Sequence, residues 1–231
     1  MLKYTCALFD LDGTLLDTEE IYAKINQEFI NKYGDGKEYT WETRSKVMGV
    51  SSPKANQTII DTHKITKTRE EMVKYKKERL ETLKNEVKAF PGALEILKKL
   101  KGLGMKVAIA TSSQQGMVDY KMFSHQDMMK YVDILVCGDS KSVKKSKPNP
   151  DIFIHAAHLC GEYDMKKVVV FEDSVNGVLA GVATGGLTVA IPDSHVKQDP
   201  TFKKADVLLN SLTQFDVSIL ETPSQSCSSK I

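Results

Sequence analysis

Short apolar runs alternate with helix-like segments over most of the chain, and this alternation constrains the fold more than any other feature. Because such alternation is typical of a parallel sheet covered by helices on both faces, we expect an α/β fold. The predicted strands are Tyr4–Phe9, Lys106–Ala110, Asp133–Cys137, Val168–Glu172, Leu187–Ile191 and, more weakly, Asp206–Leu209. The predicted helices between them are Ala93–Lys101, Met117–Lys121, Pro150–Cys160 and Val175–Ala183.

The segment after the first strand has a different character. From Asp17 to Glu86 the pattern is helical and rich in charge, with few apolar residues in each helix. Residues 17–20 and 68–71 each match a capping box, which predicts the start of a helix at both places. Ser52 followed by Pro53 is typical of a third helix start. These helices have too few apolar residues to build a large core of their own.

This change of pattern divides the chain into two predicted parts. We expect a small helical cap over residues 17–87, inserted into a core formed by residues 1–16 and 88–231. The last stretch, residues 221–231, shows no periodicity and is expected to be a disordered tail.

Two carboxylates stand at the end of the first strand. Asp10 and Asp12 follow an apolar run directly and precede Gly13 and Thr14. Side chains two positions apart on an extended segment point the same way, so both carboxylates face one small volume. Like charges so close require a cation or a proton. This pattern is the electrostatic setting for phosphoryl transfer.

Other chemical groups follow the ends of later strands. Ligands of open parallel sheets bind beyond the carboxyl ends of the strands, so these groups are expected to meet the two carboxylates. Each group alone would be an ordinary turn, helix cap or solvated loop. Their joint occurrence at successive strand ends indicates a site. The groups are Thr111-Ser112-Ser113, the lysine-rich loop that ends in Lys147, and Glu172-Asp173.

The same residues resemble a known family. Asp10-Leu11-Asp12-Gly13-Thr14, Thr111, Lys147 and Glu172-Asp173 resemble the four motifs of the haloacid dehalogenase superfamily in its phosphatase branch. The resemblance runs from about residue 4 to residue 215 and implies a Rossmann-like core with a mobile helical lid. Longer stretches around these motifs are similar to the beta-phosphoglucomutase-like subfamily. Two further stretches, residues 47–57 and 119–139, are most similar to its pseudouridine-5′-phosphatase and glycerol-3-phosphatase types.

The residue types suit the hydrolysis of a phosphate monoester. Asp10 is the predicted nucleophile, because a carboxylate can form an acyl-phosphate and split one hard step into two. Asp12 is the predicted general acid and base. Thr111 would donate its hydroxyl to a phosphoryl oxygen, with help from the backbone N–H groups of Ser112 and Ser113. Lys147 would balance the charge on Asp10 and the phosphoryl group.

The expected cofactor is Mg²⁺. Asp10 and Asp173 offer hard oxygen ligands, and Mg²⁺ needs few protein ligands because it keeps waters and phosphate oxygens. The resemblance adds the backbone carbonyl of Asp12 as a further ligand, and Glu172 is expected to support the metal site. Gly49 is expected among the cap residues, around 48–57, that contact the substrate.

Alternative functions remain open at this stage. A dehalogenase is disfavoured because family dehalogenases usually lack the second aspartate, and Asp12 is present. A phosphomutase uses the same core, but the arginine that follows a Gly-Val-Ser stretch in the mutase cap is missing after residues 49–51. A non-catalytic regulatory protein is disfavoured because all the motif positions are intact. A cap cation (Lys76, Lys77 or Arg79) is a further candidate for reaching over the site.

Bulk properties bear on partners and compartment. The net charge of the chain is +2, which is too close to neutral to indicate a nucleic acid polymer as partner. No apolar run approaches the roughly 18 residues of a membrane span, and no signal-peptide pattern precedes the first strand. Free, mostly buried thiols are expected at the cysteines. We therefore expect a cytoplasmic monomer that binds a small phosphorylated metabolite.

Overall fold

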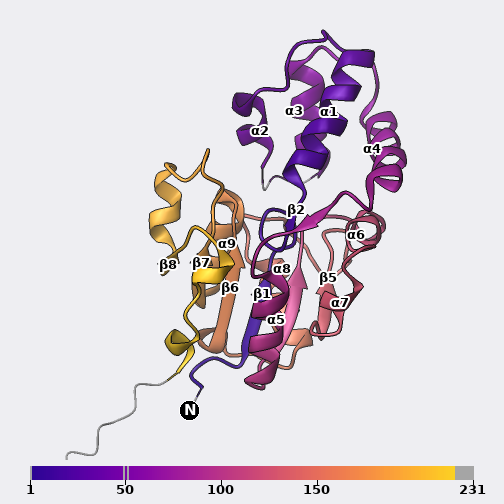
Figure 1. Ribbon diagram of the computed structural model, residues 1–231. Coiled ribbons are helices and arrows are strands. Elements are labelled where there is room, and N and C mark those ends of the chain that lie inside the picture. Colours follow the sequence, from indigo (N-terminus) through magenta and orange to yellow (C-terminus); the bar gives the residue numbers. More distant parts are fainter. Residues whose placement is uncertain (1, 49, 51, 222–231) are drawn as a thin grey trace, which may run out of the picture.

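The first predicted strand lies near the centre of a parallel sheet (Figure 1). The structure is a computed structural model that describes residues 2–48, 50 and 52–221. Within these residues the sheet has six strands in the order β5-β4-β1-β6-β7-β8, with every neighbouring pair parallel. The predicted α/β fold is confirmed, and each strand lies within its predicted range. The strands are β1 (Cys6–Phe9), β4 (Lys106–Ala110), β5 (Ile134–Val136), β6 (Val168–Glu172), β7 (Leu187–Ala190) and β8 (Val207–Leu208).

Alternate residues of the strands face two different layers of helices. Phe9 and Phe171 stack with their ring centroids 4.3 Å apart, in a cluster that includes Leu97 of the helix α5. Leu8 faces the opposite layer, where Phe153 of α8 packs against the sheet. Because helices bury both faces of the sheet, successive residues of each strand are mostly apolar, and the strands appear in the sequence as continuous apolar runs. The helices are α5 (Ala93–Gly102), α6 (Gln115–Lys121), α7 (Gln126–Met129), α8 (Asp151–Leu159) and α9 (Val175–Thr184).

A second group of helices lies beyond one end of the sheet, at the top of Figure 1. We call these the cap helices: α1 (Glu19–Tyr33), α2 (Trp41–Val47), α3 (Ser52–Thr62) and α4 (Arg69–Leu83). They enclose a small apolar cluster of their own that includes Phe29, Ile59 and Met72. The predicted boundaries of a separate cap domain, residues 17–87, remain a prediction.

The chain enters and leaves the cap helices through one short ribbon. Strands β2 (Leu16–Asp17) and β3 (Lys88–Ala89) pair in antiparallel fashion, so the two connections lie side by side. A paired two-strand connection of this kind leaves the cap helices free of any other covalent link to the sheet.

Only one of the two predicted capping boxes forms. At Thr68 the side chain accepts a hydrogen bond from the backbone N–H of Glu71, and the Glu71 carboxylate accepts one from the backbone N–H of Thr68. The capping box predicted over residues 17–20 does not form, because the N-cap of α1 is Thr18 instead of Asp17, and the Thr18 side chain makes no capping hydrogen bond. Its hydroxyl donates instead to Asp12, at 2.7 Å. Tertiary contact has redirected a residue that local sequence assigns to the helix end.

The C-terminal part is built from short turns. The predicted disordered tail is wrong at its first residue, since Glu221 forms a β-bridge with Leu2; residues 222–231 lie outside the described part of the chain. Among the described residues, no helix has the length and apolar character that crossing a membrane requires. The 3-10 turns are η1 (Met165–Lys167), η2 (Pro200–Lys204), η3 (Leu212–Gln214) and η4 (Val217–Leu220).

Candidate active site

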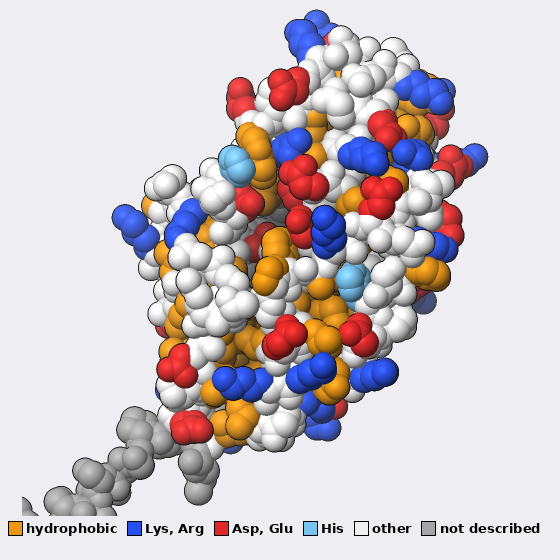
Figure 2. Space-filling model, viewed as in Figure 1, with side chains coloured by type: hydrophobic (Ala, Val, Ile, Leu, Met, Phe, Trp, Pro, Cys, Tyr) orange, Lys and Arg blue, Asp and Glu red, His pale blue; other side chains and the backbone are white. Residues whose placement is uncertain are grey.

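A cavity of about 660 Å³ lies between the carboxyl ends of the strands and the cap helices. Figure 2 shows it as a recess at the junction of the two parts, with acidic side chains in and around it. We call its sheet side the core wall and its helical side the cap wall. The predicted site residues of the core wall that line it are Asp10, Asp12, Thr111, Ser112, Ser113, Lys147 and Asp173.

Asp10 and Lys147 form the buried centre of the core wall. The backbone N–H of Asp10 donates to the carbonyl of Phe171, which fixes Asp10 at the end of β1 beside β6. The Lys147 ammonium lies 2.5 Å from Asp10 Oδ1 and 2.6 Å from Glu172 Oε1. Burial opposes the charge on this lysine, but the two carboxylates overcome it and raise the pKa of Lys147 above its usual value. The lysine therefore stays cationic between them.

Glu172 lies beneath the cavity wall and supports it. Its Oε2 accepts hydrogen bonds from the backbone N–H groups of Asp173 and Ser174 and from the Ser174 hydroxyl, each at 3.0 Å. Its Oε1 is taken by Lys147. A Cβ atom at Gly177 would lie 1.8 Å from this carboxylate, so the first turn of α9 needs glycine there. With both oxygens bound by protein donors, the geometry suits a supporting role better than that of a direct ligand.

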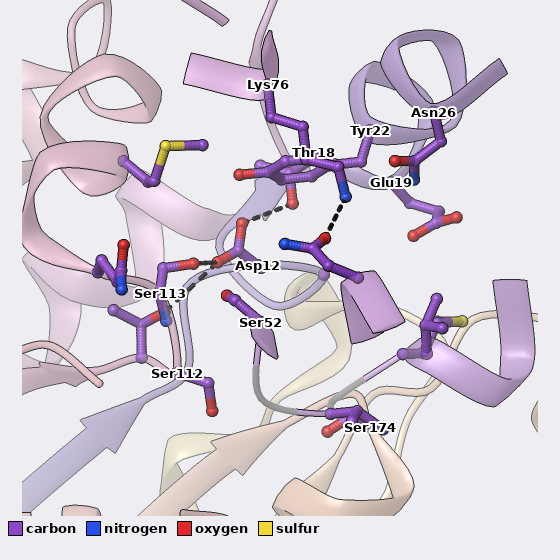
Figure 3. A pocket seen from close by; sticks show the side chains of 18 of the residues that line it. Asp12, Thr18, Glu19, Tyr22, Asn26, Ser52, Lys76, Ser112, Ser113 and Ser174 are labelled. Carbon is purple, nitrogen blue, oxygen red and sulfur yellow. Dashed lines mark hydrogen bonds between the residues drawn. The ribbon is translucent and has the colours of Figure 1, made fainter. Parts of the chain in front are cut away.

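Asp12 is held by a different set of donors (Figure 3). Its Oδ1 accepts from Thr18 at 2.7 Å and from the Lys121 ammonium at 2.6 Å, and its Oδ2 accepts from the Ser113 hydroxyl at 2.7 Å. Burial alone would raise the pKa of Asp12, but the Lys121 ammonium and these hydroxyls together lower it. Asp12 and Asp10 are thus each paired with their own lysine.

The hydroxyl loop after β4 is only partly arranged as predicted. Thr111 is anchored by its backbone N–H, which donates to the carbonyl of Val136, and its hydroxyl lies 3.4 Å from Asp12 Oδ2. The backbone N–H of Ser113 donates to the Thr111 hydroxyl at 3.0 Å, so it is not directed into the cavity. The Ser113 contribution is its hydroxyl on Asp12, which the sequence did not predict. Ser112 lines the cavity as expected.

Asp173 completes the core wall at the end of β6. The Thr14 hydroxyl donates to its Oδ1 at 2.9 Å. Gly13 packs against the same carboxylate with φ of +87°, and a Cβ there would lie 2.2 Å from Asp173 Oδ2. Burial, followed by the charges of Glu172 and Asp10, raises the pKa of Asp173 well above its usual value. Among the described residues, no lysine or arginine forms an ion pair with it.

The charges of the core wall leave room for a cation. On the core wall, four carboxylates (Asp10, Asp12, Glu172 and Asp173) face two ammonium groups (Lys121 and Lys147), which leaves a net charge of 2 − 4 = −2 for this wall when all are ionised. A hard divalent cation fits this excess of oxygen donors. Within residues 2–48, 50 and 52–221 no three His, Cys, Asp or Glu side chains are gathered as a ready metal cage. Carboxylate oxygens suit Mg²⁺, which takes few protein ligands, better than zinc, which favours His and Cys.

On the cap wall, the structure separates the three candidate cations. Lys76 lines the cavity and is buried, with its ammonium 2.7 Å from Asn56 Oδ1. Lys77 is exposed. Arg79 is bound by Glu28 at 2.6 and 2.9 Å. Only Lys76 therefore faces the site. The predicted substrate contact at Gly49 lies outside the described residues.

Several residues of the cavity were not predicted from the sequence. Lys121 carried no role in the sequence analysis, although Gln114, Met117 and Lys121 have the spacing of one helix face and all three line the cavity. That spacing was the available signal. Glu19, Tyr22 and Asn26 share one face of α1 in the same way, and they too line the cavity. A helical period shows that such residues share a face but not where the face points.

Comparison with known proteins identifies the relatives of this chain. The model of a family described as "Haloacid dehalogenase-like hydrolase" matches residues 7–191. A Drosophila melanogaster protein named "Probable pseudouridine-5'-phosphatase" is 34% identical over 215 residues, which cover 92% of each chain. The Arabidopsis thaliana "(DL)-glycerol-3-phosphatase 1, mitochondrial" is 32% identical over 215 residues, or 91% of this chain and 71% of its own. Among solved structures, CbbY from Rhodobacter sphaeroides in complex with phosphate has a TM-score of 0.78 at 25% identity, with 93% of this chain and 96% of that one covered.

Proposed function

Since the chain belongs to the haloacid dehalogenase-like hydrolase family and is an enzyme of its phosphatase type, we propose that it hydrolyses a small phosphate monoester through an aspartyl-phosphate on Asp10. The observation that carries this proposal is the arrangement of the core wall. Asp10, which is paired with Lys147, faces the same cavity as Asp12, which is paired with Lys121. The candidate substrates are sugar, polyol and nucleotide-like phosphates.

Asp10 supplies the nucleophile. In the first step an Asp10 oxygen bonds to phosphorus as the bond from phosphorus to the leaving oxygen breaks. This step needs the ionised carboxylate, yet burial raises the pKa of Asp10 to about 7, against the opposing effect of Lys147. A further positive charge beside Asp10 would favour ionisation. A cation beside Asp10 is therefore part of the proposal.

Asp12 moves the proton in both steps. In the first step protonated Asp12 gives its proton to the leaving oxygen. In the second step a water oxygen bonds to phosphorus, the bond from Asp10 to phosphorus breaks, and Asp12 takes the proton of the water. The lowered pKa of Asp12 keeps its carboxyl group ionised, which is the form that can accept a proton from water. For the acid role, its carboxyl group has to exchange Lys121, Thr18 or Ser113 for the leaving oxygen.

The groups around the phosphoryl position stabilise the charge that develops during phosphoryl transfer. Lys147 offsets the charge of Asp10, and the Thr111 hydroxyl lies on the same wall, near Asp12. The side chains of Asp10 and Asp173, with the backbone carbonyl of Asp12, would hold Mg²⁺. When bound, the cation neutralises charge on the phosphoryl oxygens. Preorganised positive groups of this kind stabilise the loose transition state of phosphoryl transfer.

A phosphomutase is the second candidate function, because it needs the same core wall. It also needs a cap cation to hold a second phosphate. Of the cap arginines, Arg44 and Arg79 are bound by Glu20 and Glu28, and Arg69 lies at the exposed rim of the cavity. The mutase arginine expected directly after residues 49–51 is missing, since Ser52 and Pro53 stand there. Simple hydrolysis is therefore favoured. We further propose that the protein acts as a cytoplasmic monomer on a free metabolite, without a nucleic acid polymer or a membrane.

A panel of phosphate esters tests the proposal. The purified protein is incubated with Mg²⁺ and glycerol 3-phosphate, uridine 5′-monophosphate, a hexose 6-phosphate, phosphoglycolate or a hexose 1-phosphate, and free phosphate is measured. We expect phosphate release that stops on chelation and returns with Mg²⁺. Accumulation of hexose 6-phosphate from the 1-phosphate would support the mutase instead. Release by the Asp10→Asn variant equal to that by the wild type would overturn the mechanism.

A further inference from the structure

Three buried polar side chains on the cap wall have no part in the proposed chemistry. They are Asn26 on α1, Asn56 on α3 and Lys76 on α4, and we call them the cap subsite. Their exposed fractions are 3%, 3% and 8%, and all three line the cavity. Figure 3 shows Asn26 and Lys76 on the cap wall, with Ser112 on the core wall. Three separate helices thus bring polar groups to one place.

Lys76 is a buried ammonium with few partners. Asn56 accepts one hydrogen bond from it, and among the described residues Lys76 forms no ion pair with a carboxylate. Burial lowers the pKa of Lys76 to about 7, although Glu19 acts in the opposite direction. An ammonium has three donor positions, and leaving donors unmatched in a buried wall is costly. The remaining donors are available to an acceptor on a ligand.

Asn26 presents the complementary group. Its amide interacts with the Tyr39 hydroxyl, and its Oδ1 has no hydrogen-bond partner among the described residues. Buried acceptors without partners are rare in folded proteins, and those that occur call for an explanation. A donor on a bound ligand would satisfy this one. The cap subsite therefore offers both a donor, Lys76, and an acceptor, Asn26.

The charges of the cap wall argue against a second anionic group on the ligand. Lys76 shares the wall with Glu19, and Arg69 at the exposed rim lies next to Glu70 in sequence. The two positive and two negative side chains cancel. Nothing on this wall matches the two lysines that hold the carboxylates of the core wall. A neutral group with its own donors and acceptors fits such a wall better than a phosphate or carboxylate.

We infer that the cap subsite binds the leaving group of the substrate and selects uncharged leaving groups that carry hydroxyl or N–H groups. This inference rests on the proposed phosphatase function and adds the class of leaving group to it. The polyol and nucleoside esters have such groups, whereas an aryl ester lacks them.

The test compares substrates that differ only in what the cap subsite can recognise. We measure kcat/KM for glycerol 3-phosphate, uridine 5′-monophosphate, phosphoglycolate and phenyl phosphate, in the wild type and in the Lys76→Met and Asn26→Ala variants. For the better hydroxylated ester, each variant should lose about 10- to 100-fold, because a buried group is left unpaired. For phenyl phosphate the loss should stay below about 3-fold, because no hydrogen bond to the leaving group is removed.

Matched controls lie on the same helices. Lys77→Met on α4 and Asn31→Ala on α1 change exposed residues outside the cavity, so kcat/KM should keep its wild-type value for every ester. Should Lys76→Met fail to fold, as judged by thermal unfolding, Asn26→Ala and Lys76→Gln decide the question. Activity on phenyl phosphate also confirms that each variant retains a working core wall.

The outcomes separate this inference from the proposed function. The inference is overturned if the variants lose activity equally on phenyl phosphate and the hydroxylated esters, or lose it on none. It is also overturned if the wild type prefers phosphoglycolate, whose leaving group bears a carboxylate, to glycerol 3-phosphate. In these cases phosphatase activity itself persists. If the wild type hydrolyses no ester faster than Asp10→Asn does, the proposed function fails.

Discussion

The two walls of the cavity differ in how their polar groups are matched. On the core wall Lys147 binds two carboxylates, and Lys121 with two hydroxyls binds Asp12. On the cap wall Lys76 binds one neutral amide, and Asn26 Oδ1 has no partner among the described residues. On the core wall each lysine is paired with a carboxylate, and an excess of negative charge remains. The cap wall is left with unmatched donors and acceptors.

This difference separates chemistry from selection. Groups that are fixed before the substrate arrives can stabilise a transition state without reorganisation. Groups that lack protein partners can gain them from a ligand, and they discriminate between ligands that do and do not provide them. The positions of the walls in the fold agree with this division. The core wall rests on neighbouring strand ends, whereas the cap wall connects to it through the β2–β3 ribbon.

The largest expected effect comes from the proposed nucleophile of the core wall. Asp10→Asn should lower kcat by about 10⁴-fold or more, because the nucleophile is lost. The fold should persist, because asparagine has nearly the same shape as aspartate and Lys147 still forms its ion pair with Glu172. Phosphate release from para-nitrophenyl phosphate measures the loss. The exposed Asp119→Asn variant is the control. Normal turnover by Asp10→Asn would show that the core wall works in another way.

The ion pairs of Lys147 on the core wall are also expected to stabilise the folded protein. Lys147→Met leaves Asp10 and Glu172 buried without their cation, which should cost about 3–5 kcal/mol in the free energy of unfolding. Denaturant titration measures it, and the exposed Lys145→Met should stay within about 0.5 kcal/mol. Adding Glu172→Gln to Lys147→Met should recover part of the loss. Equal stability of Lys147→Met and the wild type would contradict the comparison between the walls.

Lys76 on the cap wall should make the free energy of unfolding depend on pH. An unfolded lysine holds its proton up to about pH 10.4, whereas burial lowers the pKa of folded Lys76 to about 7. Between these values the unfolded state binds more protons, so the free energy of unfolding rises with pH. This contribution reaches at most about 1.4 kcal/mol per pH unit. It should be present in the wild type and in Lys77→Met, and absent in Lys76→Met, in unfolding curves from pH 7 to 9. Parallel curves for all three would refute it.

The smallest effects should separate the two predicted capping boxes. Thr68→Ala removes a real helix cap and should cost about 1 kcal/mol of unfolding free energy, with kcat unchanged. Thr18→Ala removes no cap but takes a hydroxyl from Asp12, so it should lower kcat several-fold and change stability less. Denaturant titration and phosphate release on both variants test this. A larger kcat loss in Thr68→Ala than in Thr18→Ala would reverse the assignment.

Much of the core wall was predictable because its residues follow strand ends. A parallel sheet brings the carboxyl ends of its strands to one edge whatever the loops between them do. Asp10, Lys147 and Asp173 could therefore be expected to share a cavity, and they line one cavity in the structure. The same argument could not supply Lys121, which reaches Asp12 from the middle of the chain through the orientation of α6.

The sequence by itself determined the α/β class, the positions of the six sheet strands and the core-wall residues that follow strand ends, because apolar runs and strand ends are local signals. Only the tertiary structure decided the partners of Asp12, the redirection of Thr18 and the burial of Lys76 beside Asn56. Each of these depends on the direction in which a helix face points once it packs. A helical period records which residues share a face, and packing against the rest of the molecule decides what that face meets.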